Sequence, residues 1–305
     1  MNRKVALVFP GQGSQQAGML DGCPENDDLD RLLDAAEALT GMPLRKLARE
    51  GSAEELADTR IAQPLLYLAD WAWGTGLLAS GIDPVAVAGH SLGELAALAV
   101  ADVYSVEAGL ELVVERSRLM AAAVATTSGS MSAVIGMDGA AIAAAIEGLD
   151  GVWVANDNSA GQVVISGTTE AVAEAANALA EAGARRVVPL AVAGAFHSPL
   201  MAAAAEGFSA IVAQAEFGDA LIPVYQNTAA SAATDAEVIR ERLMAQITSP
   251  VRWTETMQAF VADGITHVIE AGPGAVLTGL AKRIDGVTAL SADAVGIEQI
   301  LEEVL

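Results

Sequence analysis

The stretch that decides the fold is VAVAGHSLGELAALAV, residues 85–100. Its first four residues predict a short buried strand, and residues 93–100, which contain no helix breaker, predict a helix directly after it. Between them stands the pattern G-x-S-x-G with Ser91 at its centre. Glycines on both sides let the backbone make a sharp turn that holds a serine at a helix N-terminus. The segment predicts an α/β fold with Ser91 as a candidate nucleophile, and the alternative is a tight turn with a capping serine.

Strands and helices alternate on both sides of this segment. A strand at 4–9 ends at a Pro-Gly pair, helical periodicity follows at 30–39, 53–56 and 65–79, and a long helix is expected at 106–123. Alternation of this kind is typical of a parallel sheet with helices on both faces. Beyond residue 200 it resumes. Strands are expected at 222–225 and 267–270, with helices at 201–214, 237–247 and 254–263 and a closing helix after 273–274.

Residues 132–192 have a different rhythm. They predict the order β-α-β-β-α-β, the ferredoxin-like arrangement, with the last strand at 186–192. We therefore expect a large doubly wound, α/β-hydrolase-like domain made of residues 1–128 and 195–305. A small ferredoxin-like domain, residues 129–194, is inserted into it.

Composition excludes several classes of function. The chain of 305 residues has 16 Lys and Arg against 39 Asp and Glu, a net charge of -23. A surface of that sign repels phosphate backbones and anionic lipids, so neither nucleic acid nor a membrane is expected as a partner. Cys23 is the only cysteine, and the three histidines are scattered without metal-ligand spacing. We expect no disulfide, no metal and no cofactor.

Targeting signals are not expected either. The charged start at 1–4 is followed by an apolar run of only five residues before Pro10, which is too short for an export signal. The most membrane-like stretch, 65–82, contains Asp70 and three glycines and is better read as a buried helix. A cytoplasmic protein is expected.

A serine nucleophile needs a base, and the histidines differ in context. His90 lies inside the turn, where its ring would point away from Ser91, and His267 begins a predicted buried strand. His197, in the loop 195–199, remains as the candidate base. No acidic residue stands out as the group that orients it, so a backbone carbonyl is equally allowed. The acidic candidates are Asp157, Asp263 and Glu270.

The glycine-rich turn at 9–15, after the first strand, could supply a backbone N–H to an oxyanion. It lacks the third glycine of a dinucleotide-binding loop and the Gly-Lys-Ser or Gly-Lys-Thr of a P-loop. Its glycines alone are a weak indication of function.

Taken together, the motifs form a recognisable series. They occur in one order: GQGSQ at 11–15, GHSLG at 89–93, ER at 115–116, NS at 158–159 before GQVVISG at 161–167, FHS at 196–198, Gln246 before SPVRW at 249–253, and GPG at 272–274. This series closely resembles the malonyl-CoA:acyl carrier protein transacylase family and the related acyltransferase domains of polyketide synthases. The resemblance covers residues 5–283.

The resemblance implies a role for each matching residue. Ser91 corresponds to the nucleophile that becomes malonylated, and His197 to its base. Gln246 corresponds to the residue whose backbone carbonyl orients that histidine. Gln12 and Leu92 correspond to the donors of the oxyanion-hole N–H groups.

Further residues correspond to substrate contacts. Arg116 matches the residue that holds the malonyl carboxylate, a task that suits the planar fork of a guanidinium. Phe196 matches the bulky residue of malonyl-specific members, and Asn158 an asparagine that lines the site. Lys282 and Arg283 stand at positions that resemble contacts to the carrier protein.

The activity implied is transfer of malonyl from malonyl-CoA to the phosphopantetheine thiol of acyl carrier protein, for fatty-acid synthesis, by a protein expected to act as a monomer. The rivals are a trans-acting malonyl acyltransferase of a polyketide synthase, a thioester hydrolase and an inactive scaffold. The sequence departs from the common family pattern at Gln226-Asn227, where Asn-Asn or Ser-Asn is frequent, and at Ala275, where lysine is frequent.

Overall fold

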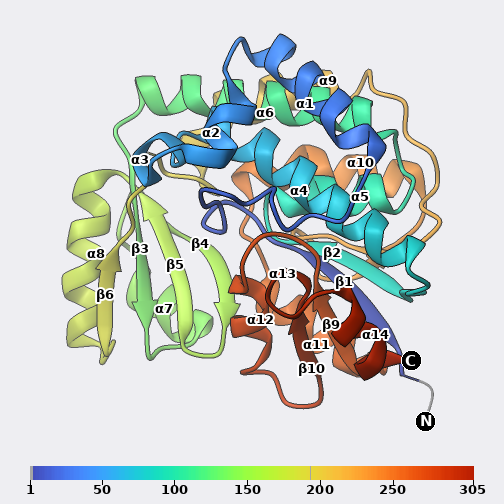
Figure 1. The fold of residues 1–305 in the computed structure, drawn as a ribbon. Coiled ribbons are helices and arrows are strands. Elements are labelled where there is room, and N and C mark those ends of the chain that lie inside the picture. The colour runs from blue at the N-terminus through green and yellow to red at the C-terminus, as the bar shows by residue number, and fades with distance from the viewer. Residues whose placement is uncertain (1–2, 193) are drawn as a thin grey trace.

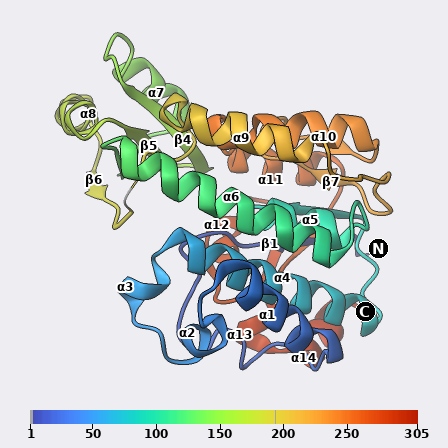
Figure 2. The ribbon, with the colours of Figure 1, turned by 90° about the horizontal axis from the view of Figure 1, so that it is seen from above.

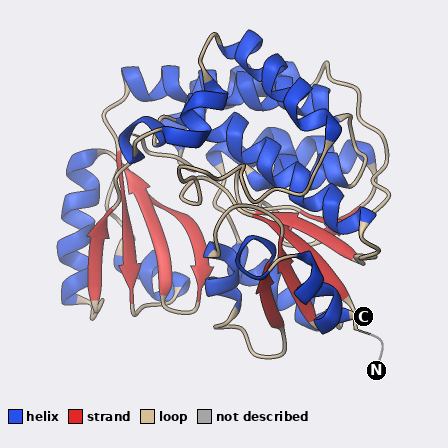
Figure 3. Cartoon of the chain, in the orientation of Figure 1, coloured by secondary structure: helices blue, strands red, loops and turns tan. Residues whose placement is uncertain are grey.

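Figure 1 shows the protein as a computed structural model that describes residues 3–192 and 194–305. Met1 and Asn2, which begin the charged N-terminal segment discussed above, lie outside the described residues, as does Ala193. The described chain forms two sheets, a larger one and a smaller one, each covered by helices (Figure 3).

The larger sheet has six strands. Five run parallel, and the last is an antiparallel edge strand. Their order is β10 (Thr288–Ser291), β9 (His267–Glu270), β1 (Val5–Phe9), β2 (Ala86–Gly89), β7 (Val224–Tyr225) and β8 (Ala232–Ala233). Because β1 and β2 are in register from Ala6↔Ala86 to Phe9↔Gly89, the turns that follow them leave the sheet at the same edge. Ligands of open α/β sheets bind at this carboxyl edge.

Side chains of β1 alternate between two cores. Leu7 and Phe9 belong to a core shared with helices on one face, while Ala6 and Val8 pack with side chains from the opposite face. The first face carries α4 (Thr59–Ala79), α5 (Gly93–Val100), α6 (Val106–Thr126) and α9 (Ala202–Val212), and the second carries α11 (Trp253–Ala262) and α12 (Val276–Ala281). Figure 2 shows α6 lying between α4 and α9. This layering puts the residues around Ser91 between two packed faces.

The smaller sheet is antiparallel and follows the predicted order β-α-β-β-α-β. Its strands are arranged as β4 (Val152–Ser159), β5 (Gln162–Gly167), β3 (Ser130–Ile135) and β6 (Arg186–Pro189). Helices α7 (Gly139–Ala145) and α8 (Thr169–Glu181) pack on one face through a core of their own. The sheet joins the larger part through a backbone pairing of Asn156 with Val251, which places β4 beside the site.

Some boundaries differ from those predicted. Helix α4 begins at Thr59, six residues earlier than expected, because the side chain of Asp58 caps it at the N–H of Arg60 and Pro64 falls inside the helix. Strand β6 ends at Pro189, since the last ladder bond is donated by the N–H of Leu190 to Met131. The remaining elements are α1 (Asp27–Thr40), α2 (Leu44–Glu50), α3 (Ala53–Leu56), α10 (Ala236–Ala245), α13 (Ala292–Val295), α14 (Ile297–Val304) and the 3₁₀ turns Pro199–Met201 and Gln246–Thr248.

None of the helices in the described ranges combines the length and the apolar character that a membrane crossing requires. The segment at 65–82 instead falls mostly within α4, where Asp70 is fully buried.

Candidate active site

The turn around Ser91 is built as the sequence predicts. A Cβ atom on Gly89 would lie 1.9 Å from the carbonyl carbon of Gly93, and one on Gly93 would lie 2.1 Å from the oxygen of Phe9. Both positions therefore require glycine. Ser91 itself has a φ of 52°, in the left-handed region that non-glycine residues adopt only at a cost of about 1–3 kcal/mol. The surrounding contacts hold the serine in this strained conformation at the start of α5.

His197 stands directly against the serine. Its Nε2 lies 2.8 Å from Ser91 Oγ, and its Nδ1 lies 3.2 Å from the carbonyl oxygen of Gln246 and 3.0 Å from that of Ser249. Carbonyl oxygens only accept hydrogen bonds, so Nδ1 carries the proton and Nε2 presents its lone pair to the serine hydroxyl. The arrangement can abstract the hydroxyl proton. His197, like Ser91, has a positive φ, of 54°.

The acidic candidates for a third member are engaged elsewhere. The hydroxyl of Thr254 donates to Asp157, the hydroxyl of Tyr225 donates to Asp263, and Glu270 accepts the N–H groups of Leu277 and Thr278 at the start of α12. Two carbonyls therefore orient the imidazole, one of which, that of Ser249, the sequence did not suggest.

Burial sets the protonation state of the base. Burial, with smaller contributions from the nearby Arg116 guanidinium and His90 ring, lowers the pKa of His197 to about 3. The carbonyls at Nδ1 act in the opposite sense but do not offset burial. The imidazole is neutral at pH 7, which is the form that accepts a proton.

This protonation state has a measurable consequence. An ordinary imidazole loses its base function as the pH falls through about 6.5. We expect His197 to cause no loss of kcat/KM for serine acylation between about pH 5 and 8, because its protonation requires a far lower pH. Burial raises the pKa of Glu94 to about 7, so this carboxyl titrates within the window. The pH dependence of kcat/KM, measured for wild type and for Glu94→Gln, separates the contributions of the two groups. A loss of kcat/KM near pH 6.5 that remains in Glu94→Gln would contradict the expectation.

Arg116 is the cation of the site and is 1% exposed. Its Nη1 donates to Gln63 Oε1 at 2.7 Å, and its Nη2 to Gln246 Oε1 at 2.9 Å and to Ser91 Oγ at 3.2 Å. Burial lowers its pKa to about 10, which still leaves it charged at pH 7. No carboxylate of the described chain forms an ion pair with it. Three of the five N–H donors are engaged, so two remain for an anion beside the nucleophile.

Three residues near the nucleophile were assigned no role in the site from the sequence, although Asn227 stands within the departure noted at 226–227. Besides Gln63, they are Asn227 and Glu94. Asn227 Oδ1 accepts the N–H of Ser91 at 2.7 Å, and its Nδ2 donates to the carbonyl of Gly89 at 2.6 Å. Glu94, fully buried, accepts the N–H of Asn227 at 2.7 Å. These bonds fix both sides of the strained turn. The position of Asn227, just past the end of β7, was the available signal, because side chains that follow parallel strands gather at one edge.

The two predicted oxyanion donors share a cavity with the nucleophile. Gln12 and Leu92 line the same pocket as Ser91, Arg116 and His197. Within the described chain, the backbone N–H of neither Gln12 nor Leu92 donates a hydrogen bond. The side chain of Gln12 is held instead by the carbonyl of Ala57 and the hydroxyl of Thr59. Both N–H groups are thus available to a developing negative charge.

Two predicted substrate contacts occupy different places. Phe196 lines the catalytic pocket. Asn158 lines a neighbouring cavity, and its Oδ1 lies 2.8 Å from His90 Nε2. From the same strand it is Asn156 that reaches the catalytic pocket, where its buried Oδ1 has no partner among the described residues. The sequence did not single out Asn156.

The comparison with protein families agrees with this geometry. The acyl transferase domain family matches residues 6–295, almost the whole chain. The chain belongs to the acyl transferase family. This acyl transferase is 42% identical over 296 residues to the malonyl CoA-acyl carrier protein transacylase of Salmonella typhimurium, with 95% of each chain covered.

Solved structures give the same picture. The malonyl CoA-acyl carrier protein transacylase of Coxiella burnetii superposes on this acyl transferase with a TM-score of 0.92 and 36% identity, covering 100% of this chain and 98% of the other. A malonyl-transacylase solved in complex with the acyl-carrier protein of a type II polyketide synthase superposes with a TM-score of 0.90 and 37% identity, covering 97% and 99%. The mixed α/β architecture is therefore that of solved transacylases.

Lys282 and Arg283, the basic pair at the end of α12, differ in their contacts. Nη1 of Arg283 donates to Ser159 Oγ at 3.2 Å and to Gln162 Oε1 at 2.9 Å, so its guanidinium connects α12 to strands β4 and β5 of the acyl transferase. Lys282 is exposed, and no hydrogen bond or ion pair joins its side chain to another described residue. The two residues are thus not equivalent.

Proposed function

We propose that this acyl transferase is a malonyl-CoA:acyl carrier protein transacylase that works through a malonyl-Ser91 intermediate. The observation that carries the proposal is the buried guanidinium of Arg116, 3.2 Å from Ser91 Oγ and without an ion-pair partner in the described chain. A buried cation is costly unless an anion joins it, so the acyl group that reaches Ser91 should carry a free carboxylate. A malonyl thioester has this property.

In the first half-reaction, Ser91 Oγ attacks the thioester carbonyl while its proton passes to Nε2 of His197. The oxyanion of the tetrahedral intermediate accepts hydrogen bonds from the backbone N–H groups of Gln12 and Leu92. The carbon–sulfur bond then breaks, and the leaving thiol takes the proton from Nε2. Malonyl-Ser91 and free coenzyme A result.

The second half-reaction runs in the reverse sense with the phosphopantetheine thiol of the carrier. His197 removes the thiol proton, the thiolate attacks the serine ester, and the oxyanion is held by the same two N–H groups. Collapse of the intermediate releases the serine, which recovers its proton from His197. One site thereby serves two large thiols in turn.

The enzyme supplies malonyl groups to fatty-acid synthesis and acts in the cytoplasm. We further propose that residues 1–128 and 195–305 form an α/β-hydrolase-like domain and residues 129–194 an inserted ferredoxin-like domain. The helices on both faces of the larger sheet and the strand order β4-β5-β3-β6 support this division.

The decisive experiment is incubation of the protein with labelled malonyl-CoA, with and without holo acyl carrier protein. We expect one malonyl adduct on Ser91 that transfers to the carrier. Label released to water at the same rate with and without carrier would indicate a hydrolase and overturn the proposal.

A carrier contact at the end of α12 is also proposed. We expect Lys282→Glu, alone or with Arg283→Glu, to raise the KM for carrier by about threefold or more and to change the KM for malonyl-CoA less, because charge reversal at a docking rim weakens association with an acidic partner. Lys46→Glu, on exposed α2, is the matched control. Equal effects on both substrates would place the docking surface elsewhere. The double variant also loses the bonds of Arg283 to the smaller sheet, so the single Lys282→Glu variant is the cleaner measurement.

A further inference from the structure

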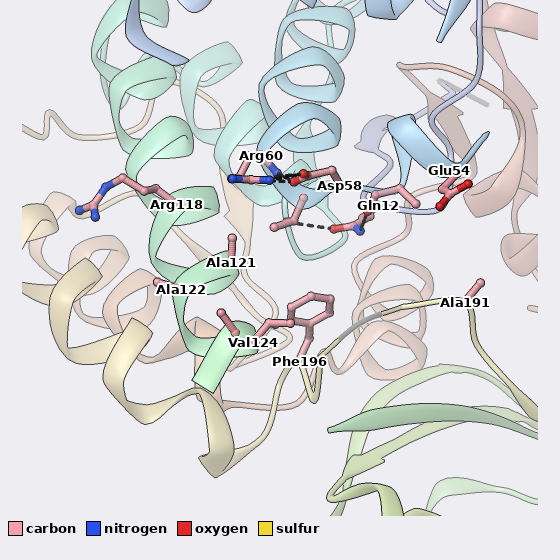
Figure 4. A pocket seen from close by; sticks show the side chains of 13 residues that line it. Gln12, Glu54, Asp58, Arg60, Arg118, Ala121, Ala122, Val124, Ala191 and Phe196 are labelled. Carbon is pink, nitrogen blue, oxygen red and sulfur yellow. Dashed lines mark hydrogen bonds and ion pairs between the residues drawn. The ribbon is translucent and has the colours of Figure 1, made fainter. Parts of the chain in front are cut away.

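A second cavity, of about 640 Å³, opens beside the catalytic pocket (Figure 4). The two share Gln12 and Phe196, so a molecule bound at Ser91 can extend from one into the other. The mechanism above leaves this cavity unused. Because it adjoins the catalytic pocket, the part of a thioester remote from the acyl group can lie in it.

The cavity is distinguished by its cations. Arg60 and Arg118 line it. Glu54 and Asp58 line it as well, so this cavity carries two cations and two carboxylates in a chain of net charge -23. A third cavity, which also opens at Gln12, is lined by glycine, amide and apolar residues together with Ser14 and His90, and by no lysine, arginine, aspartate or glutamate. An anionic group entering this region would find guanidinium donors among the lining residues of the second cavity and none among those of the third.

Both guanidinium groups keep donors available. Arg60 binds Asp58 through Nε and Nη2, and Arg118 binds Glu115 through Nε and Nη2. Within the described chain, Nη1 of neither arginine makes a hydrogen bond. The side chains are 49% and 60% exposed, and ion pairs at such exposure are worth little, so either can reorient towards a stronger anion. Glu54 and Asp58 also line the cavity, so an anion would have to compete with the carboxylate of Asp58 for Arg60.

Helix α6 connects the two ends of this region. Arg116 faces the catalytic pocket, while Arg118 and the apolar side chains of its last turns face the second cavity. These apolar residues are Ala121, Ala122, Val124 and Ala125. One helix therefore presents a cation for a carboxylate, an apolar surface, and a cation at the outer rim.

We propose that the second cavity binds the nucleotide phosphates of the acyl-CoA donor, with Arg60 and Arg118 as the phosphate contacts. The inference rests on the proposed function. It adds a distinction between the two substrates, since the phosphopantetheine of a carrier protein lacks the adenosine 3′,5′-diphosphate portion of coenzyme A. Guanidinium groups hold phosphate oxygens through charge-assisted hydrogen bonds, often two at once. The cavity thus recognises the donor and leaves the carrier to dock elsewhere.

The test compares malonyl-CoA with malonyl-pantetheine, which has the same thioester and no phosphate. We expect Arg60→Gln with Arg118→Gln to raise the KM for malonyl-CoA about tenfold, the size of one lost hydrogen bond to a charged group. The KM for malonyl-pantetheine and for carrier should change less than about twofold, since neither uses the proposed contacts. Arg49→Gln, an exposed arginine on α2 outside these cavities, is the control for net charge, and melting temperatures of all variants are measured alongside.

Two outcomes would overturn the inference. Equal increases for malonyl-CoA and malonyl-pantetheine would mean that the arginines shape the site rather than bind phosphate, and no increase for malonyl-CoA would mean that the phosphates lie elsewhere. Failure of the proposed function is distinguishable, because in that case the wild-type protein would transfer malonyl to carrier from neither thioester.

Discussion

Ser91→Ala should abolish malonyl transfer, with kcat falling by about three to six orders of magnitude. Removing the hydroxyl removes the atom that forms the ester, and substrate binding alone cannot replace it. His197→Ala should slow both half-reactions to a similar degree, because the same Nε2 accepts the proton of the serine and later that of the carrier thiol. Single-turnover acylation and carrier transfer, measured separately, check both statements.

The appropriate control is Ser128→Ala, at an exposed serine that does not line the catalytic pocket. It should transfer malonyl at the wild-type rate. Transfer by Ser91→Ala at a rate near that of wild type would exclude the covalent mechanism. If His197→Ala impaired only one half-reaction, a second base would have to serve the other.

Arg116→Ala should lower the preference for malonyl-CoA over acetyl-CoA by about a hundredfold or more, which is the scale of losing one to two hydrogen bonds to a charged group. In wild type, an acetyl group leaves the guanidinium buried without an anionic partner, whereas a malonyl group provides one. The ratio of kcat/KM for the two thioesters is the measurement. It also corrects for any general damage, since loss of the bonds to Gln63 and Gln246 would affect both substrates.

An unchanged ratio in Arg116→Ala would make the arginine a structural residue and remove the basis of the substrate assignment. Phe196→Ser provides a comparison within the same pocket. The ring lines the catalytic pocket, and we propose that it fills the space an α-methyl branch needs; a methyl group in an apolar pocket is worth about 1–3 kcal/mol. Phe196→Ser should therefore raise kcat/KM for methylmalonyl-CoA relative to that for malonyl-CoA. The ratio of kcat/KM for malonyl-CoA to that for acetyl-CoA should remain nearly unchanged.

Local patterns in the sequence were sufficient for the turn at Ser91. The glycines at 89 and 93 are required by contacts within the turn and with the neighbouring strand, so a short pattern carries the information. Periodicity likewise predicted the order of strands and helices. Periodicity did not predict the start of α4. Pro64, six residues into the helix, suggested a later start, and the N-cap depends on a single side chain, that of Asp58.

The parts of the site that the sequence did not predict depend on contacts between residues far apart in the chain, none of which belongs to a recognisable motif. Asn227 meets Ser91 across 136 residues of chain, and Gln63 meets Arg116 across 53. Amide side chains at such separations carry no spacing pattern. The group that orients His197 is a pair of backbone carbonyls, which any residue could supply. Only the resemblance to a family pointed to Gln246.

The proposed nucleophile and base share left-handed backbone geometry, which bears on attempts to make this enzyme more robust. Glycine adopts that geometry without strain, so a variant library ranked on heat resistance alone would tend to enrich glycine at positions 91 and 197. Both replacements remove the reacting groups. Under the proposed mechanism turnover depends on both side chains, so strained backbone at positions 91 and 197 is a requirement of the reaction. Engineering of this scaffold for durability therefore has to score turnover and durability together at these positions, and to search for gains in parts of the chain remote from the nucleophile.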